Sequence, residues 1–214
     1  MKKSILAIAL IAITAVSCKS EKKKVAVSEE IKDVKKVENV INSYKANIAE
    51  STVTWKGNKP TDSHNGVVNI TKGLFDIENG VLKSGEFVID MTSISCADLE
   101  AGKGKEKLEK HLKDGDFFDV EKFPTAKFEV ASSETKDGKL QVTGNLTLRG
   151  TTKSITIPAT VTQSEGVATI KSDVFSIDRT DFGVTYSSKK FNAALKDKFI
   201  NDLMEISFNI KAVK

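Results

Sequence analysis

Residues 140–161 read LQVTGNLTLRGTTKSITIPATV, and apolar and polar side chains alternate along almost all of this stretch. Leucine and valine alternate with glutamine, threonine and asparagine over residues 140–148, and the alternation resumes with isoleucine, alanine and valine over residues 155–161. Successive side chains of a β-strand point to opposite faces of a sheet. The period of two therefore predicts two half-buried antiparallel strands on either side of Arg149-Gly150-Thr151.

The same alternation recurs through the chain from about residue 41 onward. Turn-forming triplets ending in glycine separate the alternating segments, and a single segment, Gly104 to Lys113, has leucines one helical turn apart. Strands with one apolar face each and almost no helices to cover them must bury those faces against one another. We therefore predict an all-β fold, an antiparallel barrel of about eight strands with one short helix, and a two-sheet sandwich as the alternative. The further alternating segments are residues 68–70, 87–91, 128–130 and 204–210.

The first 17 residues have the pattern of a secretory signal peptide. Two lysines follow Met1, an apolar run over residues 5–15 is too short to span a bilayer, and small residues precede Cys18. The sequence Ala-Val-Ser-Cys resembles a bacterial lipoprotein cleavage site, which implies lipidation of Cys18 and attachment to a membrane of the cell envelope. The alternative is a plain secreted protein whose signal ends in cysteine.

Residues 18–43 are predicted to form a charged linker between the lipidated cysteine and the barrel domain at 44–214. Apolar residues at spacings of three and four from Ile31 to Ile48 allow an amphipathic helix capped by Ser28. Beyond residue 40 the chain has 24 basic and 24 acidic side chains. A neutral domain gives no indication of nucleic-acid binding, and the lysines of the linker fit anionic head groups or a solvated tether.

Residues 111–128, HLKDGDFFDVEKFPTAKF, hold four phenylalanines in a segment otherwise rich in turn-forming residues. Phe117 and Phe118 are adjacent, so in extended backbone one would face the barrel interior and the other the outside. Phe123 precedes Pro124, which favours extended geometry and a strand that carries Phe128. Such a segment fits a plug at the end of a filled barrel or an apolar lid over an open one, and the family resemblance described next implies the lid.

The order of several motifs resembles the YceI-like family. These motifs are HNGVVNITKG (64–73), GEFVIDMTSIS (85–95), KLEKHLKDGDFFDVEKFPTAKFEV (107–130), VTGNLTLRGTTKSITIPA (142–159), FSIDRTDFGVTY (175–186) and DKFINDLMEISFNI (197–210). The resemblance implies a lipocalin-like barrel in the periplasm or at the outer membrane that binds a polyisoprenoid lipid, such as a quinone or a polyprenyl carrier. It implies no cofactor, and it leaves the oligomeric state open.

The inward-facing aliphatic and aromatic residues, with those of the lid, are the predicted lining of the lipid site. An eight-stranded barrel is just wide enough to be filled by side chains or to hold one slender ligand. If the interior has room, its apolar walls select a hydrocarbon. The predicted lining residues are Phe87, Ile89, Phe117, Phe118, Phe123, Phe128, Leu146, Leu148, Ile155, Ile157, Met204, Ile206 and Phe208.

Polar residues suggest how the open end of the barrel is built. His111 and Arg179 are candidates for the polar end of the ligand, although Arg179 between Asp178 and Asp181 is better interpreted as a salt-bridged corner. His64 and His111 have no histidine partner at a metal-binding spacing, and Cys96 is interpreted as an apolar filler, so no metal site is predicted.

Two other function classes remain open. One is an interaction or structural module of the envelope with a solid barrel and an apolar patch on its outside. The other is a lipid-modifying enzyme, which would need a reactive polar pair such as His111 with Asp114 or Asp116. No nucleophile or phosphate-binding motif supports an enzyme, so a binding protein is the leading prediction.

Overall fold

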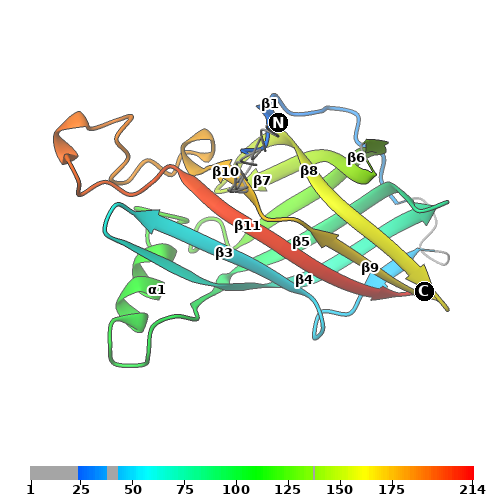
Figure 1. The fold of residues 1–214 in the computed structure, drawn as a ribbon, viewed down its shortest axis with the longest axis horizontal. Helices are drawn as coiled ribbons and strands as arrows, with labels where there is room; N and C mark the ends of the chain where they lie inside the picture. The colour runs from blue at the N-terminus through cyan, green and yellow to red at the C-terminus, as the bar shows by residue number, and fades with distance from the viewer. Residues whose placement is uncertain (1–23, 38–42, 137) are drawn as a thin grey trace, which may run out of the picture.

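A computed structural model shows an antiparallel β-barrel with one α-helix, and it describes residues 24–37, 43–136 and 138–214. The barrel lies with its strands inclined along the long axis of the molecule, and α1 lies outside one end (Figure 1). The elements are β1 (Val27–Ser28), β2 (Tyr44–Ala46), β3 (Thr52–Lys59), β4 (Asp62–Glu78), β5 (Val81–Cys96), α1 (Lys105–Lys113), β6 (Thr125–Lys136), β7 (Lys139–Leu148), β8 (Thr151–Ser164), β9 (Val167–Ser172), β10 (Phe175–Asp178), the 3-10 turns η1 (Arg179–Phe182) and η2 (Ala193–Leu195), and β11 (Leu203–Val213).

Eight strands close the ring. Hydrogen-bonded pairs run β3, β4, β5, β6, β7, β8, β9, β11 and back to β3, all antiparallel. The predicted barrel of about eight strands is therefore confirmed. The stretch at 140–161 is the β7–β8 hairpin, in which Leu140 pairs with Ala159 and Leu148 with Thr151. The predicted helix is α1, which turns Leu112 toward the core.

Two glycines allow close approach in this part of the barrel. Gly144 of β7 leaves no room for a side chain, because a Cβ there would lie 2.4 Å from the Glu129 carbonyl oxygen of β6. Gly150 has a φ of 73° at the β7–β8 turn, and the Phe123 ring packs against it. Small residues at these two positions let the lid and the neighbouring strand pack tightly on the hairpin.

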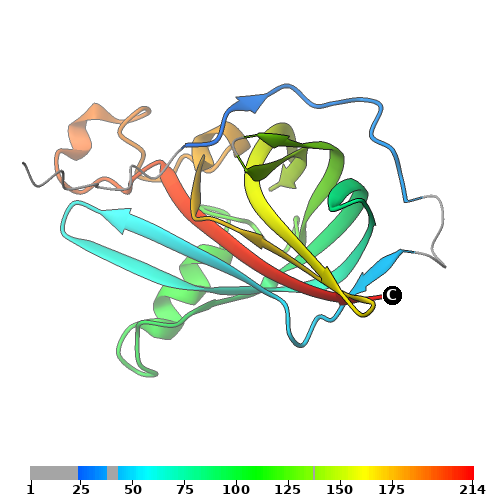
Figure 2. The same ribbon diagram turned by 45° about the vertical axis from the view of Figure 1, so that its right-hand side comes forward.

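The described part of the charged linker belongs to the barrel. Residues 24–28, which we call the seam segment, lie between β10 and β8. The Val25 N–H donates to the Ser176 carbonyl of β10 at 2.9 Å, and Val27 pairs with Ile155 of β8. Val25 is buried in the core. Figure 2 shows this segment crossing the top of the barrel before the chain continues to β2.

The predicted amphipathic helix from Ile31 to Ile48 is wrong where the structure describes it, because residues 28–37 contain no helix and Tyr44–Ala46 form β2; residues 38–42 lie outside the described residues. Ser28 is a strand residue rather than a helix cap, and it pairs with Ser154 of β8. Tertiary contacts of this kind outweigh a weak helical periodicity. Farther along, the side-chain amide of Asn145 in β7 donates to the Ile31 carbonyl at 2.7 Å and accepts from the Ile31 N–H at 2.9 Å.

Candidate functional site

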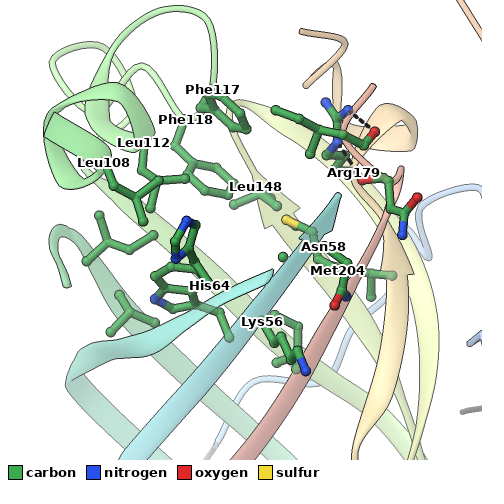
Figure 3. A pocket seen from close by; sticks show the side chains of 18 of the residues that line it. Lys56, Asn58, His64, Leu108, Leu112, Phe117, Phe118, Leu148, Arg179 and Met204 are labelled. Atoms are coloured by element: carbon green, nitrogen blue, oxygen red, sulfur yellow. Dashed lines mark hydrogen bonds between the residues drawn. The ribbon is translucent and has the colours of Figure 1, made fainter. Parts of the chain in front are cut away.

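A cavity of about 280 Å³, which we call the outer cavity, occupies one end of the barrel. This volume is close to the lower limit of about 300 Å³ for typical ligand pockets. The walls come from β3, β4, β5, β7 and β11, while α1 and the lid cover the end (Figure 3). Most of the lining is aliphatic or aromatic, and the polar side chains gather at the rim, including Lys56, Asn58, His64 and His111.

A smaller inner cavity of about 90 Å³ lies deeper in the barrel. Its lining has no charged or hydrogen-bonding side chain. Val53, Ile89 and Leu146 line both cavities, so the two are neighbours separated only by this ring of aliphatic side chains. The two cavities give the barrel an apolar interior with a polar rim at one end, which suits a slender molecule with a hydrocarbon tail and a polar head.

Twelve of the thirteen residues predicted to line the site do line one of the two cavities. Seven of them lie in the outer cavity and seven in the inner, with Ile89 and Leu146 in both. The exception is Phe123, which is half-buried and packs against Gly150 instead of lining either cavity. Its position before Pro124 places it ahead of β6 on the barrel end, beside the β7–β8 turn. Whether any of these residues binds lipid stays a prediction.

The two adjacent phenylalanines of the lid do not face opposite ways. Phe117 and Phe118 both line the outer cavity, with ring centroids 6.4 Å apart. The expectation of opposite faces assumed extended backbone, whereas the segment turns: Phe117 N–H donates to the Asp114 carbonyl and Phe118 N–H to the Leu112 carbonyl. The lid therefore contributes two aromatic rings to the cavity roof.

Arg179 forms a buried corner of the outer cavity. Its side chain is only 1% exposed, and its guanidinium donates to the carbonyls of Val184, Ile200 and Asn201 and to the Asp202 carboxylate. Burial lowers the pKa of Arg179, while the nearby acids oppose that shift. With four hydrogen bonds from its guanidinium to the protein, Arg179 is a structural clamp, and the alternative role in recognising a head group is not favoured by this geometry.

Asp178, next to this clamp, fixes two lysines. Its carboxylate accepts from Lys190 at 2.5 Å and from Lys24 of the seam segment at 3.1 Å, and Thr180 also donates to it. Burial by itself would raise the pKa of Asp178, but these hydrogen bonds outweigh burial and lower it. The corner is thus salt-bridged, but with other partners than the sequence suggested: among the described residues Arg179 pairs with Asp202, and the cations on Asp178 are Lys24 and Lys190.

His111 stands at the rim as predicted, on α1. Its ring contacts the Phe117 and Tyr186 rings edge-on, each at a centroid distance of 4.9 Å, and Nε2 lies 3.4 Å from the Asp116 carboxylate. The His111–Asp116 pair on which an enzyme would depend is thus brought together. Both groups are partly exposed to solvent, and no third residue of the described chain is seen to orient them as a catalytic unit.

His64, Cys96 and Asp98 meet beside the outer cavity, although sequence spacing gave His64 no metal-ligand partner. The spacing argument was wrong here, because the pairing of β4 with the end of β5 brings together residues more than 30 positions apart. Asp98 accepts from the Cys96 thiol and the Asn65 N–H, and its other oxygen lies 3.0 Å from His64 Nδ1.

These hydrogen bonds account for the cluster without a metal. Burial opposes ionisation of Asp98, yet the three hydrogen bonds lower its pKa to about 2. Burial and the bond to Asp98 raise the pKa of the Cys96 thiol. A protonated thiol that donates to a carboxylate is a stable polar tie at the end of the β4–β5 pair, and it is unsuited to act as a nucleophile.

Several lining residues were not predicted. Val53 and Trp55 of β3 alternate with polar residues, so the same period-two rule could have found them. Leu108 and Leu112 line the cavity from the predicted helix. Ile200 and Asn201 come from an irregular loop, where no local pattern indicates which residues face inward.

Comparison with known proteins gives a consistent result. The profile of the YceI-like domain family matches residues 44–212. A UPF0312 protein of Vibrio vulnificus is 40% identical over 84 residues, which cover 36% of this chain and 44% of the relative. A UPF0312 protein of Pseudomonas aeruginosa is 49% identical over 51 residues, covering 24% of this chain and 27% of the relative. Each alignment with these curated relatives thus spans less than half of the relative.

Solved structures share the fold. BcnA of Burkholderia cenocepacia superposes with a TM-score of 0.65 at 23% identity, covering 78% of this chain and 99% of that one. A polyisoprenoid-binding domain from Saccharophagus degradans, implicated in plant cell wall breakdown, superposes with a TM-score of 0.58 at 14% identity, covering 79% and 97%. Among the described residues, no helix is long and apolar enough to cross a membrane.

Proposed function

Because the chain belongs to the YceI-like domain family, we propose that it binds an isoprenoid lipid of the quinone or polyprenyl type and sequesters or carries it in the bacterial cell envelope. The observation on which this depends is the apolar compartment formed by the outer and inner cavities. A solid barrel, the requirement of the alternative structural module, does not match that compartment. The polyisoprenoid-binding domain with the same fold supports the choice of ligand class.

The shape of the compartment supports one orientation of the ligand. The isoprenoid tail would pass Val53, Ile89 and Leu146 into the inner cavity, which offers it only apolar contacts. The head would remain at the rim, near Lys56, Asn58 and His111. Burial of hydrocarbon stabilises such a complex by about 0.8 kcal/mol per CH₂ group relative to water.

The role is binding without turnover. The two most conspicuous polar residues of the site have structural partners: Arg179 clamps backbone carbonyls, and His111 packs between aromatic rings. Attachment to a membrane through Cys18, after removal of residues 1–17, completes the proposal. Both features lie outside the described residues and remain predictions from the sequence.

Lipid extraction is the direct test. The full chain is purified from envelope membranes of its own host in a mild detergent, and organic extracts are analysed by mass spectrometry beside native mass spectra of the intact protein. One isoprenoid lipid per chain is expected. A chain that is consistently empty, or that carries only ordinary phospholipid, would contradict the proposal.

A ligand titration gives an independent measurement. Trp55 is the sole tryptophan of the sequence and lines the outer cavity. A quinone entering the cavity should quench Trp55 fluorescence until one equivalent is bound. A saturated hydrocarbon-tailed alcohol should compete and restore the fluorescence, because the tail provides most of the binding energy. Quenching that never saturates would indicate collisions with a protein that has no site.

A further inference from the structure

The loop that joins η1 to β11, residues 185–200, projects from the open end of the barrel, and we call it the mouth loop. In Figures 1 and 2 it extends beyond the barrel at the same end as α1 and the β3–β4 hairpin. Its base is held from both sides, because Arg179 donates to the carbonyls of Val184 and Ile200. The Ile200 N–H also donates to the Ser187 carbonyl at 2.9 Å. The mouth loop is thus a protrusion on a rigid base.

The tip of the mouth loop exposes apolar side chains. Phe191 is 64% exposed, and Ala193 and Ala194 beside it are exposed as well. Tyr186, at the start of the loop, is 39% exposed and packs against His111 at the rim of the outer cavity. The exposed apolar side chains are grouped on one protruding loop, and grouped exposed apolar surface marks a site of interaction with another surface.

Charge indicates what that surface is. The mouth loop contains four lysines and one aspartate. Lys190 is paired with Asp178, whereas the salt bridges within residues 24–37, 43–136 and 138–214 leave Lys189, Lys196 and Lys198 without an acidic partner. Lysines around an exposed aromatic ring match the interface of an anionic bilayer, where the ring enters the headgroup region and the ammonium groups meet phosphates.

The mouth loop also adjoins the cavity and the N-terminal segment. Ile200, at the end of the loop, lines the outer cavity. Lys24 of the seam segment binds Asp178, which also binds Lys190 of the loop. Cys18 is only six residues before Lys24, a span of at most about 20 Å. A lipid on Cys18 would therefore hold the loop and the cavity opening near the same membrane.

We propose that the mouth loop docks on an anionic lipid bilayer, with Phe191 inserted in the headgroup region, so that the outer cavity opens toward the membrane. This inference rests on the proposed lipid-binding function and adds the surface from which the lipid enters. A lipid that leaves the bilayer beside Phe191 reaches the cavity without crossing water.

Insertion can be measured with a tryptophan at the tip. The full chain carrying Phe191→Trp and Trp55→Phe is added to vesicles of phosphatidylcholine with brominated acyl chains, with or without phosphatidylglycerol. The control carries Ile48→Trp and Trp55→Phe. Ile48 is 54% exposed and lies by the β2–β3 turn, next to the far end of β11. Circular dichroism confirms that each variant is folded.

Docking predicts quenching by the brominated lipid and a blue-shifted emission at position 191 on anionic vesicles, and neither change at position 48. Changing Lys196 and Lys198 to glutamine in the Phe191→Trp variant should weaken binding to anionic vesicles roughly 30-fold, since each lysine near such a surface contributes about fivefold. Equal quenching at both positions, which would indicate nonspecific adsorption, or solvent-like emission at position 191 on both vesicle types would overturn the proposal.

The result separates from that of the lipid-binding proposal. Quenching at position 191 requires only the loop and a bilayer, whereas extraction of an isoprenoid requires only the cavity. A chain that docks on vesicles but carries no isoprenoid would refute the lipid-binding function and support the docking surface. A chain that carries an isoprenoid but does not dock would support the lipid-binding function and refute the docking surface.

Discussion

Replacing Val53 by phenylalanine should shorten the tail that the barrel accepts. Val53 lies between the outer and inner cavities, together with Ile89 and Leu146. A larger ring at this position projects into existing space, so we expect it to close the passage with little strain in the rest of the core. The perturbation therefore removes the inner cavity from the binding site, while every lining residue of the outer cavity other than Val53 is unchanged.

The size of the effect follows from the volume lost. Unfilled apolar volume costs about 24 cal/mol per Å³, so a tail that fills the inner cavity of about 90 Å³ gains roughly 2 kcal/mol. A loss of this size weakens binding roughly 30-fold. Only ligands long enough to reach the inner cavity should lose this binding free energy. A quinone with a short tail, which occupies only the outer cavity, should bind the variant and the native chain equally well.

The assay is quenching of Trp55 fluorescence by a short-tailed and a long-tailed quinone. Thr52→Phe is the matched control, because it adds an aromatic ring to β3 at an exposed position of the outer face. The free energy of unfolding of Val53→Phe, measured in urea, should be equal to or above that of the native chain, since space is filled. An equal loss of affinity for both quinones, or no loss for either, would refute the continuous two-cavity compartment.

Three further predictions concern the contacts that shape the site. Asn145→Ala removes both hydrogen bonds to Ile31. It should lower the free energy of unfolding in urea by about 1–3 kcal/mol and speed proteolysis within residues 24–37. Unchanged proteolysis would argue against a bound segment. In Arg179→Lys, the lysine cannot supply the donors that reach both ends of the mouth loop. We expect the free energy of unfolding to fall by about 3–5 kcal/mol and new protease cleavage in the loop. A variant as stable as the native chain would contradict the clamp. The pKa of Asp98 is lowered to about 2, so its stabilisation is complete above about pH 4 and is lost as the pH falls toward 2. Asp98→Asn should therefore be less stable than the native chain by about 2 kcal/mol at neutral pH, with a difference that vanishes in acid denaturation near pH 2; a pH-independent difference would exclude the titration of Asp98 as the cause.

The strands could be predicted because their signal is local. Each alternating stretch, such as residues 140–148, carries its own period, and neighbours in sequence pair in the barrel. Since the inner face of a small barrel is its interior, the same alternation also identified ten of the twelve predicted residues that line a cavity, and the other two, Phe117 and Phe118, came from the lid. The lid required more than a period, because hydrogen bonds from Phe117 and Phe118 to residues 112 and 114 turn the backbone and place both rings on one side.

Contacts between distant segments could not be predicted in this way. Lys24 and Asp178 are 154 positions apart, and His64 meets Asp98 only because β4 and β5 pair. The helix expected behind Ser28 was wrong for the same reason. The weak helical spacing from Ile31 onward was the one local signal available, whereas Ser28 pairs with β8 and Ile31 bonds to Asn145 of β7, two strands that follow much later in the chain.

The energetics of transfer connect the cavity with the membrane-facing surface. An isoprenoid tail is already shielded from water in a bilayer, so moving it into an equally apolar cavity returns little of the free energy that burial from water would give. Net affinity then depends on the fit of the tail past Val53, on contacts of the head at the rim, and on the ordering of a flexible chain. Those terms are small and of both signs, which favours reversible exchange.

Such exchange is fast only if the tail avoids water on its way, because exposure of several CH₂ groups would add about 0.8 kcal/mol each to the barrier. A cavity that opens beside a bilayer-docked loop lowers that barrier, whereas the same cavity facing the aqueous phase would hold its lipid for long times. If the barrel binds an isoprenoid as proposed, the orientation of the mouth loop decides whether it acts as a carrier or as a store.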